Sequence, residues 1–250
     1  VAAQLLAEQA RALDEVLNPT QRLALAWALK EACLGAWHTD PVRTQTAAQR
    51  LSELAARSEG QCEIDALAAW TGAIADLARG AMSEAVVGLD RAAMLFETLG
   101  QAHHAAQTQV PKIMALSMLG QYDEATACAK ITLRALTQQG DTASAAKLSQ
   151  NMGSLHMHRD AYAAAAHHYR EAAVMFARSG QMRASVMADI GLADANTAQG
   201  DFDAATLMYA RARQRAVHHD LPVLAAIVDE STAMLELARG RYSSALAGLE

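Results

Sequence analysis

The 250-residue sequence contains few of the residues on which β-sheets depend. Aromatic residues make up 4% of the chain, although hydrophobic residues of all kinds make up 52%. The apolar content is mostly alanine, leucine and methionine, and β-branched residues are sparse. No segment alternates polar and apolar residues over the length of a strand. These absences exclude a sheet-based fold and favour closely packed helices.

Cysteine is also scarce. The three cysteines, Cys33, Cys62 and Cys128, lie far apart, and none belongs to a Cys-x-x-Cys motif. The sequence therefore predicts no disulfide framework, which is typical of a reducing compartment, and we expect a cytoplasmic protein. Each cysteine lies in a small, apolar pattern, so we expect all three to be buried hydrophobic residues.

The chain lacks an excess of positive charge and a long apolar run. The formal net charge is -6, and no basic stripe is present, so we expect no nucleic-acid partner. No apolar segment approaches the roughly 18 residues that span a bilayer. Residues 1–17 contain acidic residues, and their apolar residues recur at helical spacing, unlike a signal peptide. These features leave a protein or a peptide as the expected partner.

Patterns that carry catalysis or bind metal are absent as well. Nine histidines occur, including the adjacent pairs His103–His104 and His167–His168. Adjacent residues on a helix diverge by about 100°, and no His-Glu-x-x-His motif is present. Glycines are spaced singly, so no phosphate-binding loop is predicted, and no group that would activate a cysteine can be identified. We predict no catalytic, metal-binding or cofactor-binding residues, and no enzyme activity within this segment.

A repeat of forty residues organises the sequence. Residues 121–160 and 161–200 each contain two helix-length blocks of twenty, and each block ends on glycine or aspartate. A fixed period of this length, split into two helices, is typical of an α-helical repeat array. The predicted helices span residues 1–17, 21–38, 43–58, 62–79, 82–98, 102–119, 122–138, 142–158, 162–178, 182–199, 202–218 and 222–239.

The repeat predicts one domain over residues 1–250. Residues 1–40 form divergent N-terminal helices, residues 41–250 form regular repeats, and the last repeat is truncated at the C-terminus. Glycine at a block end suits the left-handed residue that commonly terminates a helix. Within this frame Thr20 is expected to cap a helix, Pro111 to bend one, and Gly153 to lie where two helices approach closely.

A second pattern marks the start of every second helix. A bulky residue two places after the break is followed three residues later by alanine, at Met82/Ala85, Tyr122/Ala125, Tyr162/Ala165, Phe202/Ala205 and Tyr242/Ala245. With Tyr169 and Tyr209 four residues after the alanine, these helices resemble those of tetratricopeptide repeats (TPRs), in a longer variety with a period of forty. The resemblance implies an all-α fold, a right-handed superhelical solenoid of antiparallel helix pairs whose first helices line a concave peptide-binding surface.

A narrower resemblance concerns two runs, residues 100–125 and residues 185–195. They are similar to the TPR region in front of bacterial CHAT-domain proteins, which are caspase-like peptidases. This resemblance implies the sensor or regulatory part of a larger peptidase, whose catalytic domain would lie beyond Glu250. The alternative is the effector- or partner-binding arm of a bacterial transcriptional regulator. The sequence leaves the oligomeric state open.

The repeat frame also selects candidate binding residues on the first helices. Polar residues at positions that recur every forty residues would stack into a strip on the concave side. The predicted partner-binding residues are Gln107, Lys147, Gln150, Asn151, Ser154, Asp194 and Glu230. The strip changes from basic and neutral to acidic along the chain, although a solvated helical face would show the same residues.

Overall fold

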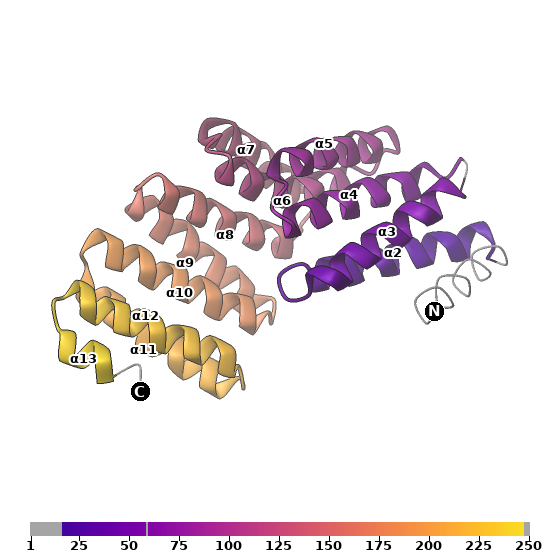
Figure 1. Ribbon diagram of the computed structural model, residues 1–250. Coiled ribbons are helices and arrows are strands. Elements are labelled where there is room, and N and C mark those ends of the chain that lie inside the picture. The colour runs from indigo at the N-terminus through magenta and orange to yellow at the C-terminus, as the bar shows by residue number, and fades with distance from the viewer. Residues whose placement is uncertain (1–16, 59, 248–250) are drawn as a thin grey trace. The chain divides into compact units, whose positions relative to one another are not determined.

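The structure is a computed structural model, and it describes residues 17–58 and 60–247 (Figure 1). These residues form helices and no strand, which confirms the predicted all-α fold. The helix predicted for residues 1–17 lies, except for residue 17, outside the described residues. The described helices are α2 (Pro19–Ala36), α3 (Pro41–Ala56), α4 (Cys62–Ala78), α5 (Met82–Thr98), α6 (Ala102–Met118), α7 (Tyr122–Gln138), α8 (Thr142–His158), α9 (Tyr162–Arg178), α10 (Met182–Gln199), α11 (Phe202–His218), α12 (Pro222–Ala238) and α13 (Tyr242–Ala247).

Contacts divide the chain into two compact units after Gly120. Unit 1 holds α2 to α6, and unit 2 holds α7 to α13. Within each unit, a helix packs mainly on its neighbours in sequence, and the short turns make successive helices antiparallel (Figure 1). This is the packing of a TPR-like solenoid. The single domain over residues 1–250 stays a prediction.

The turns explain why the period is so regular. Eight glycines at block ends adopt positive φ angles of 70° to 83°, and Asp160 and Asp220 do so at 54° and 52°. At one such turn the Gln101 N–H donates to the Phe96 carbonyl over 2.8 Å, as in the Schellman motif. Asp40 differs, because its φ is -145° and its side chain instead accepts from the Arg43 N–H at the start of α3.

Two local predictions about helix starts and bends have different outcomes. Thr20 does not cap α2, because the helix begins one residue earlier at Pro19. Asn18 is the cap, and it exchanges hydrogen bonds with Gln21 in a capping box. Pro111 lies inside α6, which continues from Ala102 to Met118. The bend at Pro111 stays a prediction.

Small residues hold the paired helices together, as the repeat pattern predicts. The alanine three residues after each bulky helix start is at most 1% exposed in the described repeats. Seven residues further along, Ala92, Ala172 and Ala212 are fully buried, and Thr132 is 3% exposed. Gly153 of α8 is a close-contact position as well, because a Cβ added there would lie 2.7 Å from the ring of Tyr169 on α9.

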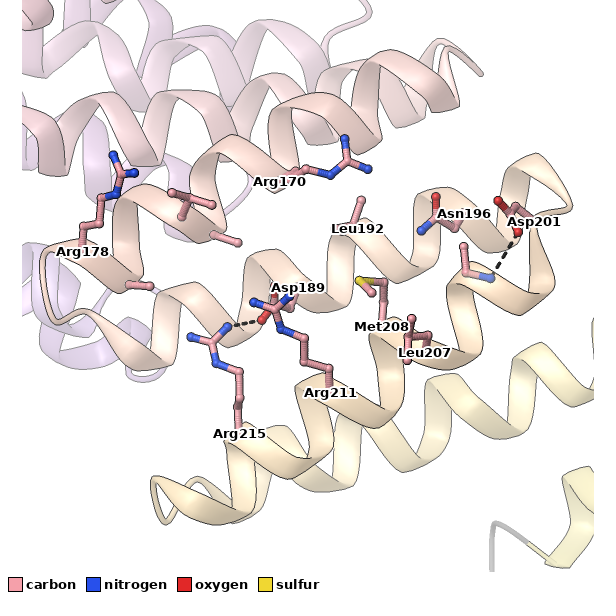
Figure 2. Close-up of a pocket in the computed structure, with 14 residues that line it drawn as sticks. Arg170, Arg178, Asp189, Leu192, Asn196, Asp201, Leu207, Met208, Arg211 and Arg215 are labelled. Carbon is pink, nitrogen blue, oxygen red and sulfur yellow. Dashed lines mark hydrogen bonds and ion pairs between the residues drawn. The ribbon is translucent and has the colours of Figure 1, made fainter.

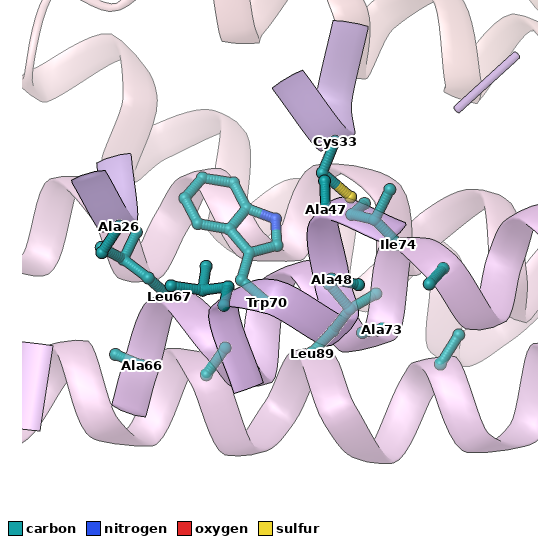
Figure 3. Packing of buried hydrophobic residues seen from close by; sticks show 14 of the residues in the cluster. Ala26, Cys33, Ala47, Ala48, Ala66, Leu67, Trp70, Ala73, Ile74 and Leu89 are labelled. Carbon is teal, nitrogen blue, oxygen red and sulfur yellow. The ribbon is translucent and has the colours of Figure 1, made fainter. Parts of the chain in front are cut away.

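The core of unit 1 is one large cluster in which leucines, isoleucines and aromatic residues pack among alanines. Trp70 of α4 packs among Leu67, Ile74 and Leu89, and its ring meets the edge of Phe96 at 6.0 Å between centroids (Figure 3). Trp27 and Trp37 are half-buried against the same core. All three tryptophans therefore contribute to the core of unit 1.

The cysteines divide into three environments. Cys33 is fully buried in the core of unit 1, and burial raises the pKa of its thiol to about 11. Cys128 is half-buried on α7, whereas Cys62 is exposed in the first turn of α4. The expectation of burial is therefore wrong for Cys62. This residue is the first of α4, and the end of the helix is open to solvent there.

Unit 2 buries smaller clusters. One surrounds Phe176 with alanines of α8, α9 and α10, and a second surrounds Tyr169. A third joins Val186, Tyr209 and Leu224. Alanine is the commonest residue in the first two, so the helices approach closely and leave their polar side chains near neighbouring helices.

Candidate protein-binding surfaces

The predicted residues in unit 2 lie on the first helices α8, α10 and α12. We use the name first-helix strip for Lys147, Gln150, Asn151, Ser154, Met187, Asp194, Glu230 and Met234, whose positions recur every forty residues. Lys147 and Glu230 are exposed, and neither forms an ion pair with a described residue. Met234 is 60% exposed, so the strip offers apolar as well as charged contacts. Gln107 is half-buried on α6 in unit 1.

Tyrosines from the second helices reach the strip. The hydroxyls of Ser154 and Tyr169 lie 3.0 Å apart, and the Tyr209 hydroxyl donates to the Asp194 carboxylate. Each pair spans fifteen residues and joins the two helices of one repeat. Ser154 and Asp194 thus orient tyrosines that are 8% and 3% exposed. Both residues therefore have a role within the fold. Their assignment to partner binding stays a prediction.

The Tyr169 ring packs against two positions of the neighbouring first helices that have no side chain. A Cβ on Gly153 of α8 or on Gly191 of α10 would lie 2.7 Å from this ring. Both glycines therefore permit Tyr169 to insert between the two first helices. The Tyr209 position lacks this glycine pair, because Ala193 replaces Gly153 one repeat later.

Burial alters the electrostatics of the strip. Burial raises the pKa of Asp194 above its ordinary value, and the hydrogen bond from Tyr209 offsets part of that rise. Burial and the Asp194 carboxylate both raise the pKa of Tyr209. The tyrosine therefore stays neutral and donates, while Asp194 is the acceptor that titrates.

Asp189 and Asp229 occupy equivalent positions one repeat apart, and both bond to α11. Asp189 is 3% exposed and forms an ion pair with Arg215, whose guanidinium also donates to the Ser185 hydroxyl over 2.8 Å. Asp229 pairs with Arg213 at 2.5 Å. Both aspartates therefore bond to a neighbouring helix.

A second candidate surface is formed mainly by second helices of the repeats. A cleft of about 510 Å³ opens between α9 and α11, with α10 as its floor (Figure 2). We call it the α9–α11 cleft. Arg170 and Arg178 stand on the α9 side, and Arg211 and Arg215 on the α11 side. Sequence reasoning missed this cleft, although Arg170, Val174 and Arg178 are spaced to share one face of a helix.

A sequence profile of the soluble NSF attachment protein (SNAP) family matches residues 77–226, which is more than half of the chain. The chain belongs to the SNAP family. The match covers α5 to α11 and therefore includes the cleft and most of the first-helix strip. No curated protein sequence matches this SNAP-family chain significantly.

Solved structures with the same helical repeats share its fold. RapI in its apo form is similar with a TM-score of 0.68 at 9% identity, over 96% of this chain and 66% of RapI. BtubC (BKLC) from P. vanneervenii is similar with a TM-score of 0.59 at 17% identity, over 80% of this chain and 92% of BtubC.

A kinesin light chain from Podospora anserina with TPR-like repeats is also similar. Its TM-score is 0.59 at 15% identity, over 80% of this chain and 97% of the kinesin light chain. At these identities the similarities show the fold alone. The TPR-like repeat fold of the SNAP-family chain is thereby confirmed, and such repeats generally mediate interactions between proteins.

The remaining polar features of the SNAP-family chain are dispersed. Over residues 17–58 and 60–247, no three histidine, cysteine or acidic side chains gather in a way that would hold a metal ion. His156 and His168 stack with their ring planes 3° apart, and burial lowers the pKa of both imidazoles. Among the described helices, none has the length and apolarity needed to cross a membrane.

Proposed function

We propose that this SNAP-family chain is a non-catalytic scaffold that binds a protein or peptide along the first-helix strip. The observation that carries the proposal is a pair of exposed, opposite charges, Lys147 on α8 and Glu230 on α12, that no described residue neutralises. The family name describes attachment to the protein NSF. Attachment of one protein to another is therefore the activity that family membership supports.

The strip favours a partner with a defined direction. Its Lys147 end is basic, its Glu230 end is acidic, and Met187 and Met234 offer exposed apolar contacts. An extended or helical segment with an acidic end and a basic end would match these charges. Charge complementarity of this kind sets orientation and association rate more than affinity. A preformed helical surface also loses little conformational freedom on binding.

Site-specific photocrosslinking tests the location. A photoreactive amino acid is placed at Met187 or Met234 on the strip, and at Ile131 or Val217 on second helices, all of which are at least 36% exposed. Proteins crosslinked in cells are then identified by mass spectrometry. We expect a common adduct from Met187 and Met234. An adduct that forms only from Ile131 and Val217 would refute the assignment to the first helices.

Charge reversal tests the orientation. The Lys147→Glu/Glu230→Lys variant reverses both ends and leaves the net charge unchanged. We expect it to bind the crosslinked partner more weakly, by roughly threefold to tenfold, because each exposed pair contributes about 0.2–1 kcal/mol. Asp194 is left intact, since its loss would disturb Tyr209. Unchanged affinity would show that the charges do not contact the partner.

A narrower role concerns the larger protein. We propose that the segment regulates a bacterial CHAT-domain peptidase, and the support is the resemblance of residues 100–125 and 185–195 to the repeats in front of such peptidases. The alternative is a partner-binding arm of a transcriptional regulator. The reading frame that encodes the chain distinguishes them. A caspase-like domain with a His and Cys pair supports the first, and a DNA-binding domain supports the second.

A further inference from the structure

The α9–α11 cleft contains more guanidinium groups than it can neutralise. Its lining includes four arginines and two aspartates. Asp189 is committed to Arg215, and Asp201 accepts from the Ala204 N–H over 3.2 Å as the cap of α11. Both carboxylates therefore act within the fold. Arg170, Arg178 and Arg211 are exposed, and none of their guanidinium groups forms an ion pair or a hydrogen bond with a described residue, although the charge of Arg211 also lowers the pKa of Asp189.

The centre of the cleft is apolar. Val174 on α9 is 45% exposed and Leu207 on α11 is 65% exposed, while Leu192 on the floor is 4% exposed (Figure 2). Apolar area of this kind gains free energy when an aliphatic side chain covers it. A polyanion such as nucleic acid would leave it uncovered. The ligand that matches the whole lining therefore combines carboxylates with aliphatic groups.

The spacing of the arginines sets the length of the ligand. Arg170 and Arg178 are eight residues apart on α9, which corresponds to about 12 Å along a helix axis. Val174 lies midway between them. In an extended peptide, two carboxylates four residues apart are separated by about 13 Å. The residues between those carboxylates would face Val174 and Leu207.

This pattern is specific to one pair of second helices. On α7 the residues equivalent to Arg170, Val174 and Arg178 are Lys130, Arg134 and Gln138. On α11 the equivalents are Ala210, Gln214 and His218. The basic, apolar, basic order therefore occurs on α9 and not on these neighbours. A solvated helix face shared by all repeats would not show this difference.

We propose that the α9–α11 cleft is a second docking site, which binds a short acidic peptide segment with aliphatic residues between its carboxylates. Arg170 and Arg178 bind the two flanking carboxylates, and Arg211 binds from the α11 side. Val174 and Leu207 receive the aliphatic side chains. The site uses second helices, so it is separate from the first-helix strip and does not depend on the function proposed for that strip.

Fluorescence anisotropy with synthetic peptides tests the site. The probe is a fluorescein-labelled peptide with two glutamates on each side of three leucines. We expect saturable binding that weakens as salt is added. The Arg170→Gln/Arg178→Gln variant should weaken binding by about tenfold or more, because it removes two charge-assisted contacts. Leu207→Ala should weaken it severalfold.

Matched variants control for charge and exposed apolar area. Lys130→Gln/Arg134→Gln removes the same charge from the α7 face, and Val217→Ala removes a valine of α11 that is 61% exposed and lies outside the cleft lining. Both should bind the probe like the wild type. So should Lys147→Glu/Glu230→Lys, whatever its effect on the first-helix partner. All the substituted side chains are exposed, and melting curves check that each variant is folded.

Two altered probes separate the alternatives. A peptide with glutamine in place of glutamate, and one with serine in place of leucine, should both bind at least tenfold more weakly. Absence of saturable binding at millimolar probe would overturn the proposal, as would equal weakening by the α7 control. Equal binding of the serine peptide, or stronger binding of a single-stranded oligonucleotide, would show a general polyanion surface and would also overturn it.

Discussion

The two units of the chain build the same helical repeat around hydrophobic cores that are organised differently. Unit 1 packs Trp70, Phe96, leucines, isoleucines and alanines into one large cluster. Unit 2 packs alanines around single aromatic residues such as Phe176 and Tyr209, and ties its helices with Arg–Asp pairs. The period depends on turn glycines and on small residues at fixed positions, and it tolerates either kind of core. The difference teaches that unit 2 divides its core into smaller clusters and carries Arg–Asp pairs between its helices, and both proposed binding sites lie in this unit.

The two units also differ in how they bond the cationic side chains between their helices. In unit 1, Lys112 is 8% exposed, and its ammonium bonds to both carboxylate oxygens of Asp90 on α5, at 2.7 and 2.9 Å. The ammonium of Lys30 lies 4.5 Å from the centre of the Trp70 ring. In unit 2 the half-buried Arg215 has a comparable role, and its planar group bonds to Asp189 and Ser185 at once.

The strongest test of the comparison removes a phenylalanine from each core. Phe96 and Phe176 occupy equivalent positions, at 0% and 1% exposure. Each substitution by alanine should cost about 3–5 kcal/mol of unfolding free energy. Phe96→Ala should cost more, by about 0.5–1.5 kcal/mol, because it also loses the aromatic pairing with Trp70. Denaturant titration measures both. An equal or larger loss for Phe176→Ala would contradict the distinction between the cores.

A bulky side chain tests the close approach of helices in unit 2. Gly153→Leu should lower the unfolding free energy by roughly 1–3 kcal/mol, since the Tyr169 ring occupies the space that the new side chain requires. Thermal melting followed by circular dichroism measures the loss. The hydrogen bond between Ser154 and Tyr169 should be disturbed together with the packing. An unchanged melting temperature would mean that Tyr169 moves aside without cost.

A glycine in unit 1 should respond in the opposite direction. Nothing lies within 4 Å of a Cβ added to Gly72 of α4. Gly72→Ala should therefore stabilise the protein by about 0.5–1 kcal/mol, because alanine loses less conformational freedom in a helix. Gly88→Ala is the matched control, since its Cβ would lie 2.9 Å from that of Ala73. A gain as large at Gly88 as at Gly72 would show that space does not decide the effect.

The smallest effect concerns pH and the Tyr209 pair. Burial raises the folded-state pKa of Asp194 above its ordinary value of 3.8, so the stability linked to its proton is present below pH 3.8 and is lost as the pH rises through the raised pKa. Asp194→Asn keeps an acceptor for Tyr209 and cannot ionise. Its unfolding free energy relative to the wild type should therefore increase as the pH rises over that window, and should then level off.

The equivalent position in the preceding repeat provides the control for this titration. Ser154 pairs with Tyr169 without a titrating group of its own. Ser154→Ala should change stability by an amount that does not vary with pH over the same window. Urea titrations at several pH values compare the two variants. A pH-dependent difference for Ser154→Ala, or a constant one for Asp194→Asn, would refute the role assigned to Asp194.

The sequence predicts helix bounds well because the signals are local. A left-handed glycine ends a helix at its own position, and an alanine such as Ala165 is buried by the partner helix of its own repeat. The bonding partners of polar side chains are harder to predict, because they depend on the rotation of one helix against another. Ser154 and Asp194 bond to tyrosines fifteen residues away, and Arg215 of α11 bonds to Asp189 of α10, which lies 26 residues earlier. No spacing in a single repeat identifies these partners.

The packing of each helix on its sequence neighbours has a consequence for how the protein is made. Every extensive helix contact in residues 17–58 and 60–247 joins elements that are adjacent or next but one along the chain. Contacts of such short sequence separation close small loops, which favours rapid folding. Helix pairs can therefore form in order as they leave the ribosome, each one stacking on a pair that is already folded. Unit 1, with its larger core, would be complete before the helices of unit 2 are synthesised.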